Sequence, residues 1–469
     1  MELFQGEKMT DCLMDTEWIM ELARRTGFSV PTIHQLIEVC YFQFPPKNVK
    51  TEVLDLIHAI QRPQRWYSLR INPVRLTKKP KNHILDEIRV YFHAHPNIRI
   101  PNLIFLPVDG PFNLIKQSRE IVIDKFAAES VMIGANLYIP GFQAPLPSFE
   151  AGEQFSIYGP NHEHVANGIA QFSNEEILNK KKGVGIQTTE SIYRIPSYRD
   201  SIYYSSGLIS DHSFGPYLAC LLLMQFYKEN DVIMDVCSAP GHKTCALSEI
   251  VFSKFGVFPK IYSIDRSTKR LEALYTDITR LGLQNIQIIP KAIEKLPTYH
   301  PELLGTANFL VLDPPCSALG TRPKLAIDHT DEEYRSLFLL QRRIAKEIMP
   351  FLSKDAIILY TTCSLSVLEN EGIVSILMRD HGLELLDATK ILYQFLTEED
   401  EMFLKKEFTR GIFRNEQQIH TTPFMDSVHI VDLDRYFILS RDDAKKVIRI
   451  SPKGEYSTGY FIALLQKKQ

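Results

Sequence analysis

Two cysteines, Cys316 and Cys363, each stand in a polar segment directly after a predicted buried strand. Cys316 follows Asp313 and two prolines, which restrict the backbone between the carboxyl and the thiol. Cys363 stands between two threonines and Ser364. A lone cysteine at a strand end is usually a small buried apolar residue. Two cysteines in matching positions favour thiol chemistry, because a thiolate is a strong nucleophile.

These cysteines do not have the spacing of a metal site. Neither belongs to a Cys-x-x-Cys pair, and no histidine pair stands near either one. Structural zinc sites usually show such spacing, so we expect no metal. The chain has seven cysteines in 469 residues, an odd and low number that indicates a reducing, intracellular compartment.

A second group of residues is typical of a site for an adenosine-type cofactor. The segment after the predicted strand 232–236 contains Gly241, where the backbone can approach a ligand closely, and a helix with free N–H groups follows. Asp265 ends the next predicted strand, a position from which an acid accepts ribose hydroxyls. The segment has neither the Walker A spacing nor a GxGxxG fingerprint. The predicted cofactor-binding residues are Cys237, Ser238, Ala239, Pro240, Gly241, His242, Lys243, Asp265 and Asp313.

Strands and helices alternate through the second half of the chain. Apolar runs predict strands at 232–236, 260–264, 286–289, 308–312, 356–360 and 460–465, with helices between most of them, including 267–281 and 331–352. This alternation predicts an α/β fold with a mostly parallel sheet covered on both faces. Ligands of such sheets bind at the carboxyl ends of the strands, where both groups of residues stand.

The first half of the chain has a different character. Residues 14–25 and 32–41 show helical periodicity, whereas 111–190 contains short predicted strands separated by glycine and proline, which is typical of a small barrel. Residues 62–99 hold nine Lys and Arg against two acidic residues, a net charge of +7. This segment is either a solvated helix face or a patch that contacts an RNA backbone. The lysine triplet 180–182 is more often a solvated turn than a binding site.

Composition excludes several classes of protein. Apolar residues make up 45% of the chain and charged residues 23%, so disorder is not the dominant state. The longest apolar stretch is too short to span a membrane, and the N-terminus does not read as a secretory signal. The net charge of −3 means that any nucleic-acid site must be a local patch.

Three segments resemble motifs one, four and six of the Sun/Nop family of RNA cytosine-5 methyltransferases, in the family's order. They are residues 235–244, 313–317, and 361–364 with Glu369-Asn370-Glu371. Further resemblances are the Arg-x-Asn element at 70–72, a PUA domain over 121–158 that includes the stretch 134–141, and a closing strand at 459–463. Together with Arg322-Pro323, these match the PUA-containing members, which methylate tRNA.

The resemblance implies a fold and a division of the chain. The fold is a Rossmann-like, S-adenosylmethionine-dependent methyltransferase domain with an inserted PUA barrel and a helical N-terminal region. The implied division is a helical, RNA-binding region at 1–110, a PUA domain at 111–200 and a catalytic domain at 201–469. The implied partner is tRNA, and other RNA is a further candidate. We expect a cytoplasmic monomer that does not bind membranes.

The resemblance also implies roles for single residues. Cys363 attacks carbon 6 of cytosine and so activates carbon 5, Asp313 binds ring nitrogen 3 and the amino group, and Cys316 assists release. Lys243 completes the catalytic group and lowers the pKa of the nucleophile. The target base must be flipped or unpaired, which costs little at the end of a tRNA acceptor stem. The RNA-binding residues expected are Arg70, Asn72, Lys78, Lys79, Lys81, Tyr138, Lys181 and Lys182.

The chain departs from the family pattern at several positions. Its Gly-Gly-Lys is Gly241-His242-Lys243, its Cys-Ser-Gly is Cys316-Ser317-Ala318, and residues 289–292 lack the acid that usually follows the third strand. The missing acid predicts weaker cofactor binding than is usual for the family. Two alternatives stay open: an inactive RNA-binding PUA protein, and a DNA cytosine methyltransferase, whose nucleophile would be the cysteine of the Pro-Cys motif. Retention of Cys363 argues against both.

Overall fold

A computed structural model describes residues 15–43, 49–76, 81–95, 100–396, 407–412 and 439–467. The largest unit is a nine-stranded sheet, in which the strands follow the order β11-β10-β9-β12-β13-β17-β16-β15 and β14 also pairs with β17. Its first five strands are parallel, and β17 runs antiparallel to β13. The strands are β9 (Val232–Val236), β10 (Lys260–Ile264), β11 (Ile286–Ile289), β12 (Ala307–Leu312), β13 (Leu352–Thr362), β14 (Leu383–Leu386), β15 (Phe408–Arg410), β16 (Ile448–Ile450) and β17 (Tyr460–Lys467).

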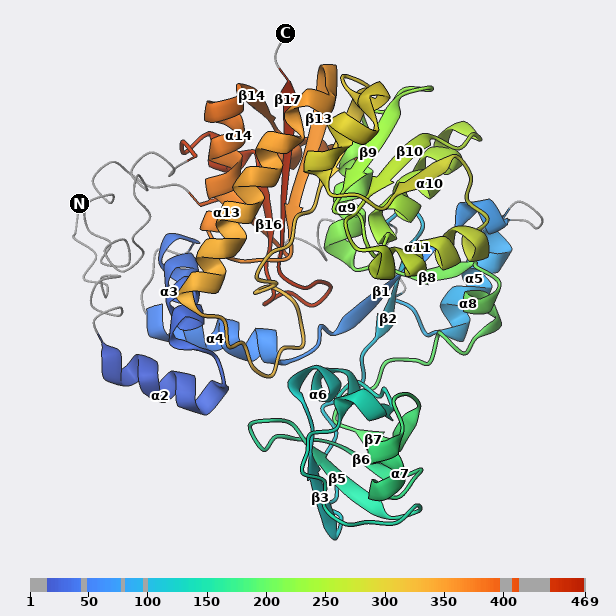
Figure 1. Ribbon diagram of the computed structural model, residues 1–469, viewed down its shortest axis with the longest axis vertical. Coiled ribbons are helices and arrows are strands. Elements are labelled where there is room, and N and C mark those ends of the chain that lie inside the picture. The colour runs from blue at the N-terminus through green and yellow to red at the C-terminus, as the bar shows by residue number, and fades with distance from the viewer. Residues whose placement is uncertain are drawn as a thin grey trace.

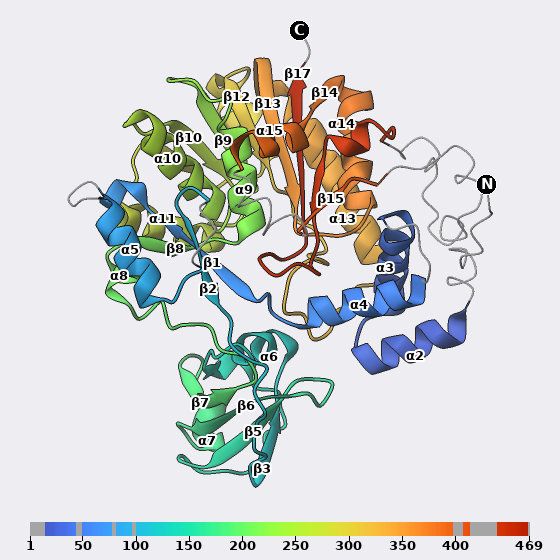
Figure 2. The same cartoon turned by 180° about the vertical axis from the view of Figure 1, so that it is seen from behind.

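Helices cover both faces of this sheet (Figures 1 and 2). Alternate strand residues point to opposite faces, so the sheet divides the core into two clusters. One cluster lies under α9, α10 and α15, and the other under α13 and α14. The helices are α9 (Phe214–Leu223), α10 (His242–Phe255), α11 (Thr268–Leu281), α12 (Leu296–Tyr299), α13 (Asp331–Glu347), α14 (Ile373–His381) and α15 (Ala388–Phe395).

A separate five-stranded sheet of order β3-β5-β6-β7-β4 lies below the large sheet in Figures 1 and 2. Its entry and exit segments pair with each other, because the amides and carbonyls of Asp109 and Arg194 exchange hydrogen bonds of 2.9 Å. This unit is therefore an insertion with its own core. It contains β3 (Arg119–Val122), α6 (Lys125–Val131), β4 (Leu137–Tyr138), β5 (Gln154–Tyr158), β6 (His164–Ala170), α7 (Asn174–Asn179) and β7 (Val184–Ser191).

The N-terminal part consists of three helices and a small sheet. The helices α2 (Thr16–Thr26), α3 (Val30–Gln43) and α4 (Val49–Gln61) share a core with Leu319 and Leu365, which follow the two cysteines. These helices therefore pack against the two loops that follow β12 and β13 and carry Cys316 and Cys363. A three-stranded sheet of order β2-β1-β8 comes next. Its elements are β1 (Trp66–Ile71), α5 (Lys81–Tyr91), β2 (Leu103–Pro107), α8 (Ile202–Ser205) and β8 (Ile209–Asp211).

The strand and helix predictions for the second half are confirmed, and three strands (β9, β10 and β11) have the predicted bounds. The helix predicted at 331–352 ends at Glu347, because Pro350 lies in a 3-10 turn and the chain then enters β13. The region 1–110 is not wholly helical, since β1 and β2 lie in it. No helix within the described ranges has both the length and the apolar character needed to cross a membrane.

Candidate active site

The two predicted cysteines meet at the carboxyl ends of neighbouring strands. Cys316 follows β12 and Cys363 follows β13, and their Sγ atoms lie 3.3 Å apart. Hydrogen bonding to Cys363 and burial raise the pKa of Cys316 well above its usual value. The Cys316 thiol therefore keeps its proton at neutral pH and can donate it to the neighbouring sulfur.

A buried glutamate ties the two cysteine loops together. Glu369 Oε2 accepts hydrogen bonds of 2.5 Å from the hydroxyls of Ser317 and Ser364, each of which directly follows one of the cysteines. Its Oε1 accepts from the Ser317 amide and from Gln341 Nε2, both at 2.9 Å. The two serine oxygens are 2.8 Å apart. One carboxylate thus joins the two loops that carry the thiols, together with a bond from the Gly320 amide to the Cys363 carbonyl at 2.8 Å. The sequence showed Glu369 only as part of a motif, with no sign of this role.

An ion pair stands beside the thiols. The Lys243 ammonium from the first turn of α10 contacts Asp313 at the end of β12, and Thr361 Oγ1 donates to the Asp313 carboxylate at 3.1 Å. Burial disfavours the ammonium, but Asp313 outweighs burial and raises the pKa of Lys243 well above its ordinary value. Lys243 therefore keeps its charge, and the pair places a cationic donor next to the Asp313 carboxyl oxygens.

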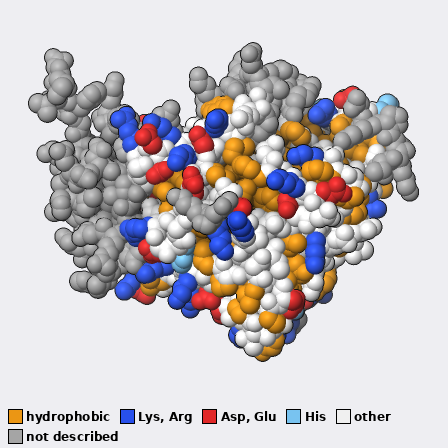
Figure 3. Space-filling view, turned by 90° about the horizontal axis from the view of Figure 1, so that it is seen from above, with side chains coloured by type: hydrophobic (Ala, Val, Ile, Leu, Met, Phe, Trp, Pro, Cys, Tyr) orange, Lys and Arg blue, Asp and Glu red, His pale blue; other side chains and the backbone are white. Residues whose placement is uncertain are grey.

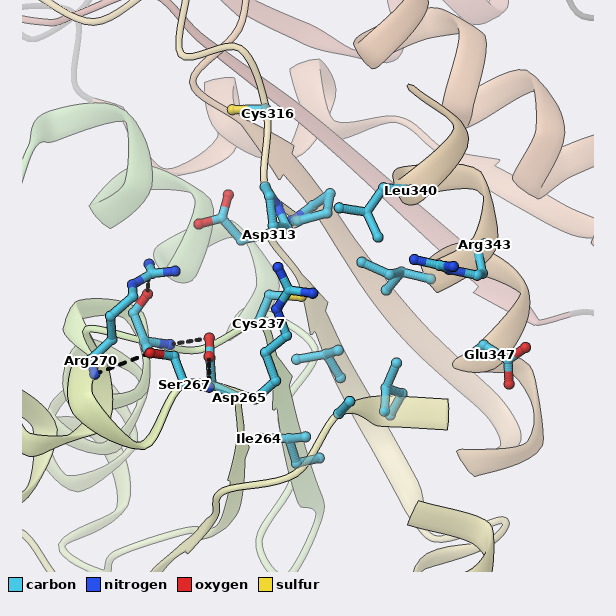
Figure 4. Close-up of a pocket in the computed structure, with 18 of the residues that line it drawn as sticks. Cys237, Ile264, Asp265, Ser267, Arg270, Asp313, Cys316, Leu340, Arg343 and Glu347 are labelled. Atoms are coloured by element: carbon cyan, nitrogen blue, oxygen red, sulfur yellow. Dashed lines mark hydrogen bonds between the residues drawn. The ribbon is translucent and has the colours of Figure 1, made fainter. Parts of the chain in front are cut away.

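A cavity of about 510 Å³ opens next to these groups. Figure 4 shows Asp265 and Arg270 on one side, Leu340, Arg343 and Glu347 of α13 on the other, and Asp313 between them. The amides of Ala239 and Ser267 hold the Asp265 carboxylate at 3.1 and 2.8 Å, so its orientation is set before a ligand arrives. Both cysteines also line this cavity.

The expected cofactor residues divide between this cavity and a smaller one. Cys237, Ala239, Asp265 and Asp313 line the larger cavity. The smaller cavity is lined by Cys237, Ser238, Ala239, Pro240, His242, Lys243 and Asp313 together with residues before α9. Gly241 lines neither. Its φ is +109°, and a Cβ at this position would lie 2.5 Å from Leu274, so close packing of α11 requires the glycine and the expectation of ligand approach is corrected.

The sequence analysis missed part of the cavity wall. The missed residues are Arg266, Ser267, Arg270, Lys291, Ile293, Glu294, Leu340, Arg343, Ile344 and Glu347. Those on α13 lie on a helix with no motif, so no local signal pointed to them. Glu294 provides a carboxylate after the third strand, four residues beyond Pro290. Glu294 thus lies close in sequence to residues 289–292, which lack the acid that the family usually has after the third strand.

Two residues expected to contact RNA have structural roles instead. The Arg70 side chain is 2% exposed, and it pairs with Glu249 at 2.7 Å inside the fold. Asn72 is fully buried, and its amide donates at 2.9 Å to the carbonyls of Gly207 and Leu281. The Arg70–Glu249 ion pair and the hydrogen bond from Asn72 to Leu281 connect the small three-stranded sheet to the catalytic unit. The expectation that they bind RNA is therefore wrong, because neither side chain reaches the surface.

The remaining RNA-binding predictions have mixed outcomes. Lys78 and Lys79 lie outside the described residues, as does the side chain of Lys81. Tyr138 is 56% exposed, and Lys181 and Lys182 are also exposed. On the face seen in Figure 3, basic and acidic side chains are interspersed, in keeping with the small net charge.

Comparison with known proteins agrees with this geometry. Residues 222–466, more than half of the chain, match the family described as 16S rRNA methyltransferase RsmB/F. The chain belongs to this family. Residues 119–192 match the PUA domain, so the methyltransferase carries an inserted PUA domain. The cofactor of this methyltransferase is S-adenosylmethionine.

Two curated relatives of the methyltransferase are tRNA-modifying enzymes. The tRNA (cytosine(72)-C(5))-methyltransferase of Pyrococcus horikoshii is 28% identical, over 70% of this chain and 82% of the relative. The human tRNA (cytosine(72)-C(5))-methyltransferase NSUN6 is 26% identical, over 67% and 72%. The crystal structure of NSun6 from Pyrococcus horikoshii with SFG superposes with a TM-score of 0.69 at 24% identity, over 95% of this chain and 99% of that one. This likeness shows the same fold.

The larger cavity fits the cofactor of the family. Its volume lies within the roughly 300–1,000 Å³ typical of ligand pockets. The fixed Asp265 carboxylate can accept ribose hydroxyls, and the thiols and the Asp313–Lys243 pair stand at the same cavity. A bound methyl donor would therefore lie next to the groups that can activate a base.

Proposed function

We propose that this methyltransferase adds a methyl group to carbon 5 of a cytosine in tRNA, at the end of the acceptor stem. The observation that carries the proposal is the pair of thiols 3.3 Å apart, beside Asp313 and Lys243, at the cavity that fits the cofactor. A methyltransferase acting on a heteroatom has no use for two thiols at its cofactor cavity, whereas carbon 5 of cytosine needs covalent activation.

The chain's own residues supply that activation. The Cys363 thiolate forms a bond to carbon 6, and the electron pair of the 5,6 double bond makes carbon 5 nucleophilic. Asp313 and Lys243 stabilise the charge that spreads over the ring. When bound, S-adenosylmethionine supplies the methyl group that carbon 5 takes up. Water then takes the proton on carbon 5, the electron pair of that C–H bond re-forms the 5,6 double bond, and the carbon–sulfur bond breaks to return the Cys363 thiolate.

The assignment of the two cysteines rests on their surroundings. Cys316 holds its proton, because its pKa is raised well above the usual value, so it is poorly suited to attack. It lies within hydrogen-bond distance of the Cys363 sulfur and can assist when that sulfur leaves carbon 6. We therefore assign nucleophilic attack to Cys363 and release to Cys316.

The substrate class rests on the relatives and on the inserted unit. The two relatives above are tRNA (cytosine(72)-C(5))-methyltransferases, and both alignments extend beyond the catalytic domain. We assign the N-terminal region, which holds helices and the strands β1 and β2, to 1–110, the PUA domain to 111–200 and the catalytic domain to 201–469, in keeping with the family matches at 119–192 and 222–466. The PUA unit contacts the loop after Cys316, since Glu129 on α6 accepts from the Leu325 amide at 3.1 Å. RNA held by Tyr138 and the lysines at 181–182 would then reach the catalytic loop.

We further place the protein in the cytoplasm as a monomer. The described cysteines are all free thiols, which supports a reducing compartment.

Covalent trapping on tRNA tests the proposal. With a tRNA transcript carrying mature ends, Cys316→Ala should accumulate a protein–RNA adduct that survives denaturation, because attack proceeds and release stalls. Cys363→Ala and the double variant should form neither adduct nor methylated cytosine. Cys40→Ala is the matched control, since this buried thiol belongs to the N-terminal helices.

Each other outcome contradicts a defined part of the proposal. Adduct trapped by Cys363→Ala would move the nucleophile to Cys316, as in a DNA cytosine methyltransferase. A wild type that neither methylates nor forms an adduct would favour a protein that only binds RNA.

A further inference from the structure

A second, smaller cavity of about 110 Å³ adjoins the cofactor cavity. Cys237, Ala239 and Asp313 line both cavities, so the smaller one opens on the far side of the catalytic carboxylate. Its other walls are the turn that follows β9 and the segment that precedes α9, including His212. The proposed mechanism uses Lys243 and Asp313 from its walls but gives no role to His212.

His212 lines this cavity, and its contact with Arg70 fixes which ring nitrogen carries the proton. The residue is 2% exposed, and its Nδ1 lies 2.6 Å from Nη1 of Arg70. A guanidinium can only donate, so Nδ1 must accept, and the proton of the neutral ring sits on Nε2. Burial and the nearby charges of Arg70 and Lys243 lower the pKa of His212 well below its usual value, so the ring stays neutral.

The Nε2–H of His212 has no acceptor among the described residues. A buried donor without a partner is rare in folded proteins and calls for an explanation. Here the group belongs to a residue that lines a cavity also lined by Lys243 and Asp313. This N–H is thus available to donate a hydrogen bond to an oxygen atom of a bound substrate.

A second histidine lines this cavity. His242 is exposed and stands where the family motif has its second glycine. Its ring centroid lies 6.2 Å from that of His212. Two imidazole rings therefore line a space that a glycine at position 242 would leave wider.

We propose that the small cavity receives the O2 atom of the target cytosine, with the His212 Nε2–H as its hydrogen-bond donor. The inference rests on the proposed function. The Asp313 carboxylate accepts from the amino group, ring nitrogen 3 lies beside that group, and O2 is the next polar atom along the same edge of the base. Because Asp313 lines both cavities, a base held by it can present O2 to the smaller one while carbon 6 faces Cys363.

The contact would act on the chemical step. When the Cys363 sulfur adds to carbon 6, negative charge develops on ring nitrogen 3 and on O2. A donor already aimed at O2 stabilises that charge more than it stabilises the uncharged base. His212 would then be a catalytic residue, whereas a residue that only supports Arg70 would act on the fold.

Two substitutions separate these roles. His212→Asn keeps an acceptor near the Nδ1 position for Arg70 and removes the donor that faces the cavity. His212→Gln places its amide near the Nε2 position and gives up the bond to Arg70. Both the rate of methylation and the rate of adduct formation in a Cys316→Ala background are measured on the same tRNA transcript. Affinity for S-adenosylmethionine reports whether each variant is folded.

We expect His212→Asn to slow both rates by roughly 10–100-fold, a loss typical of removing one hydrogen-bond donor from developing charge, while His212→Gln stays within about 5-fold of the wild type. A wild-type reaction on RNA with 2-thiocytidine at the target should slow by a similar factor, and His212→Asn should be insensitive to that change. This substrate arm tests the inference even if a variant fails to fold.

Other outcomes overturn the inference. If His212→Gln is the impaired variant, the histidine serves Arg70. If His212→Asn loses its sensitivity to a 2′-deoxycytidine target instead, the acceptor is the ribose and the assignment to O2 is wrong. If the wild type is active and both His212 variants react at its rate, this inference is wrong and the proposed function stands. A wild type that methylates no cytosine would mean that the proposed function itself fails.

Discussion

Replacing Glu369 with alanine should both destabilise the fold and separate the two thiols. The substitution removes the acceptor of four buried donors: the Ser317 and Ser364 hydroxyls, the Ser317 amide and the Gln341 amide. The hydroxyl oxygens are 2.8 Å apart and can pair with each other. That pairing uses one hydroxyl proton, so three donors stay unpaired, and at roughly 1–3 kcal/mol each the free energy of unfolding should fall by about 6 kcal/mol.

The conservative variant should cost much less. In Glu369→Gln the amide nitrogen can donate to both serine oxygens and one hydroxyl can donate to the other, so a single hydroxyl proton stays unpaired and the free energy of unfolding should fall by only about 2 kcal/mol. The rate of adduct formation should depend on the position of the two thiols. A misplacement of about 1 Å between reacting groups can cost roughly 100-fold, so adduct formation in Glu369→Ala should slow by about that factor.

Thermal unfolding and adduct formation on tRNA measure these two effects. For a domain of this size, about 6 kcal/mol corresponds to a fall in melting temperature of roughly 12–24 °C. Glu384→Ala is the control, since Glu384 is exposed on β14. If Glu369→Ala melts within about 2 °C of the wild type, or forms the adduct at the wild-type rate, the glutamate does not hold the cysteine loops and this reasoning is refuted.

Three further predictions concern the same edge of the sheet. Asp265→Ala should weaken S-adenosylmethionine binding by roughly 10–100-fold, because a hydrogen bond to a charged group is lost; calorimetric titration checks this, and equal affinities would remove Asp265 from the ribose site. Burial raises the pKa of Asp235 from 3.8 to about 7, so its protonated form favours folding and the wild type should lose stability as pH rises from about 4 to 7. In Asp235→Asn, the fall in the free energy of unfolding between pH 5 and pH 8, measured by urea unfolding, should be smaller by about 3 kcal/mol. If the fall is the same as in the wild type, burial does not raise the pKa of this carboxyl. Ala318 has a left-handed φ of +53°, so Ala318→Gly, which restores the family residue, should raise the free energy of unfolding by roughly 0.5–1 kcal/mol, and a lower urea midpoint would contradict the strain.

The order of elements and the place of the chemistry could be read from the amino-acid sequence. Strands such as 232–236 and 260–264 are short apolar runs bounded by turn residues, a local pattern that depends on neighbours along the chain. Because parallel strands share one carboxyl edge, the polar residues after them had to gather there. This reasoning brought Cys316 and Cys363 to one site without any knowledge of their distance.

Contacts between distant segments needed the tertiary structure. Arg70 looked like a surface cation, but it pairs with Glu249, 179 residues away, inside the fold. Charge along the chain does not say which cation will be buried, since burial depends on what packs against it.

The same holds for the parts of the site that carry no motif. The α13 wall of the cofactor cavity, the four donors on Glu369 and the unpaired Nε2–H of His212 each result from the meeting of three or more chain segments. Sequence patterns reflect the local periods of helices and strands, whereas side-chain partners are chosen by close packing in three dimensions. Local order therefore follows from the sequence pattern, and the pairing of functional groups follows from the packed fold.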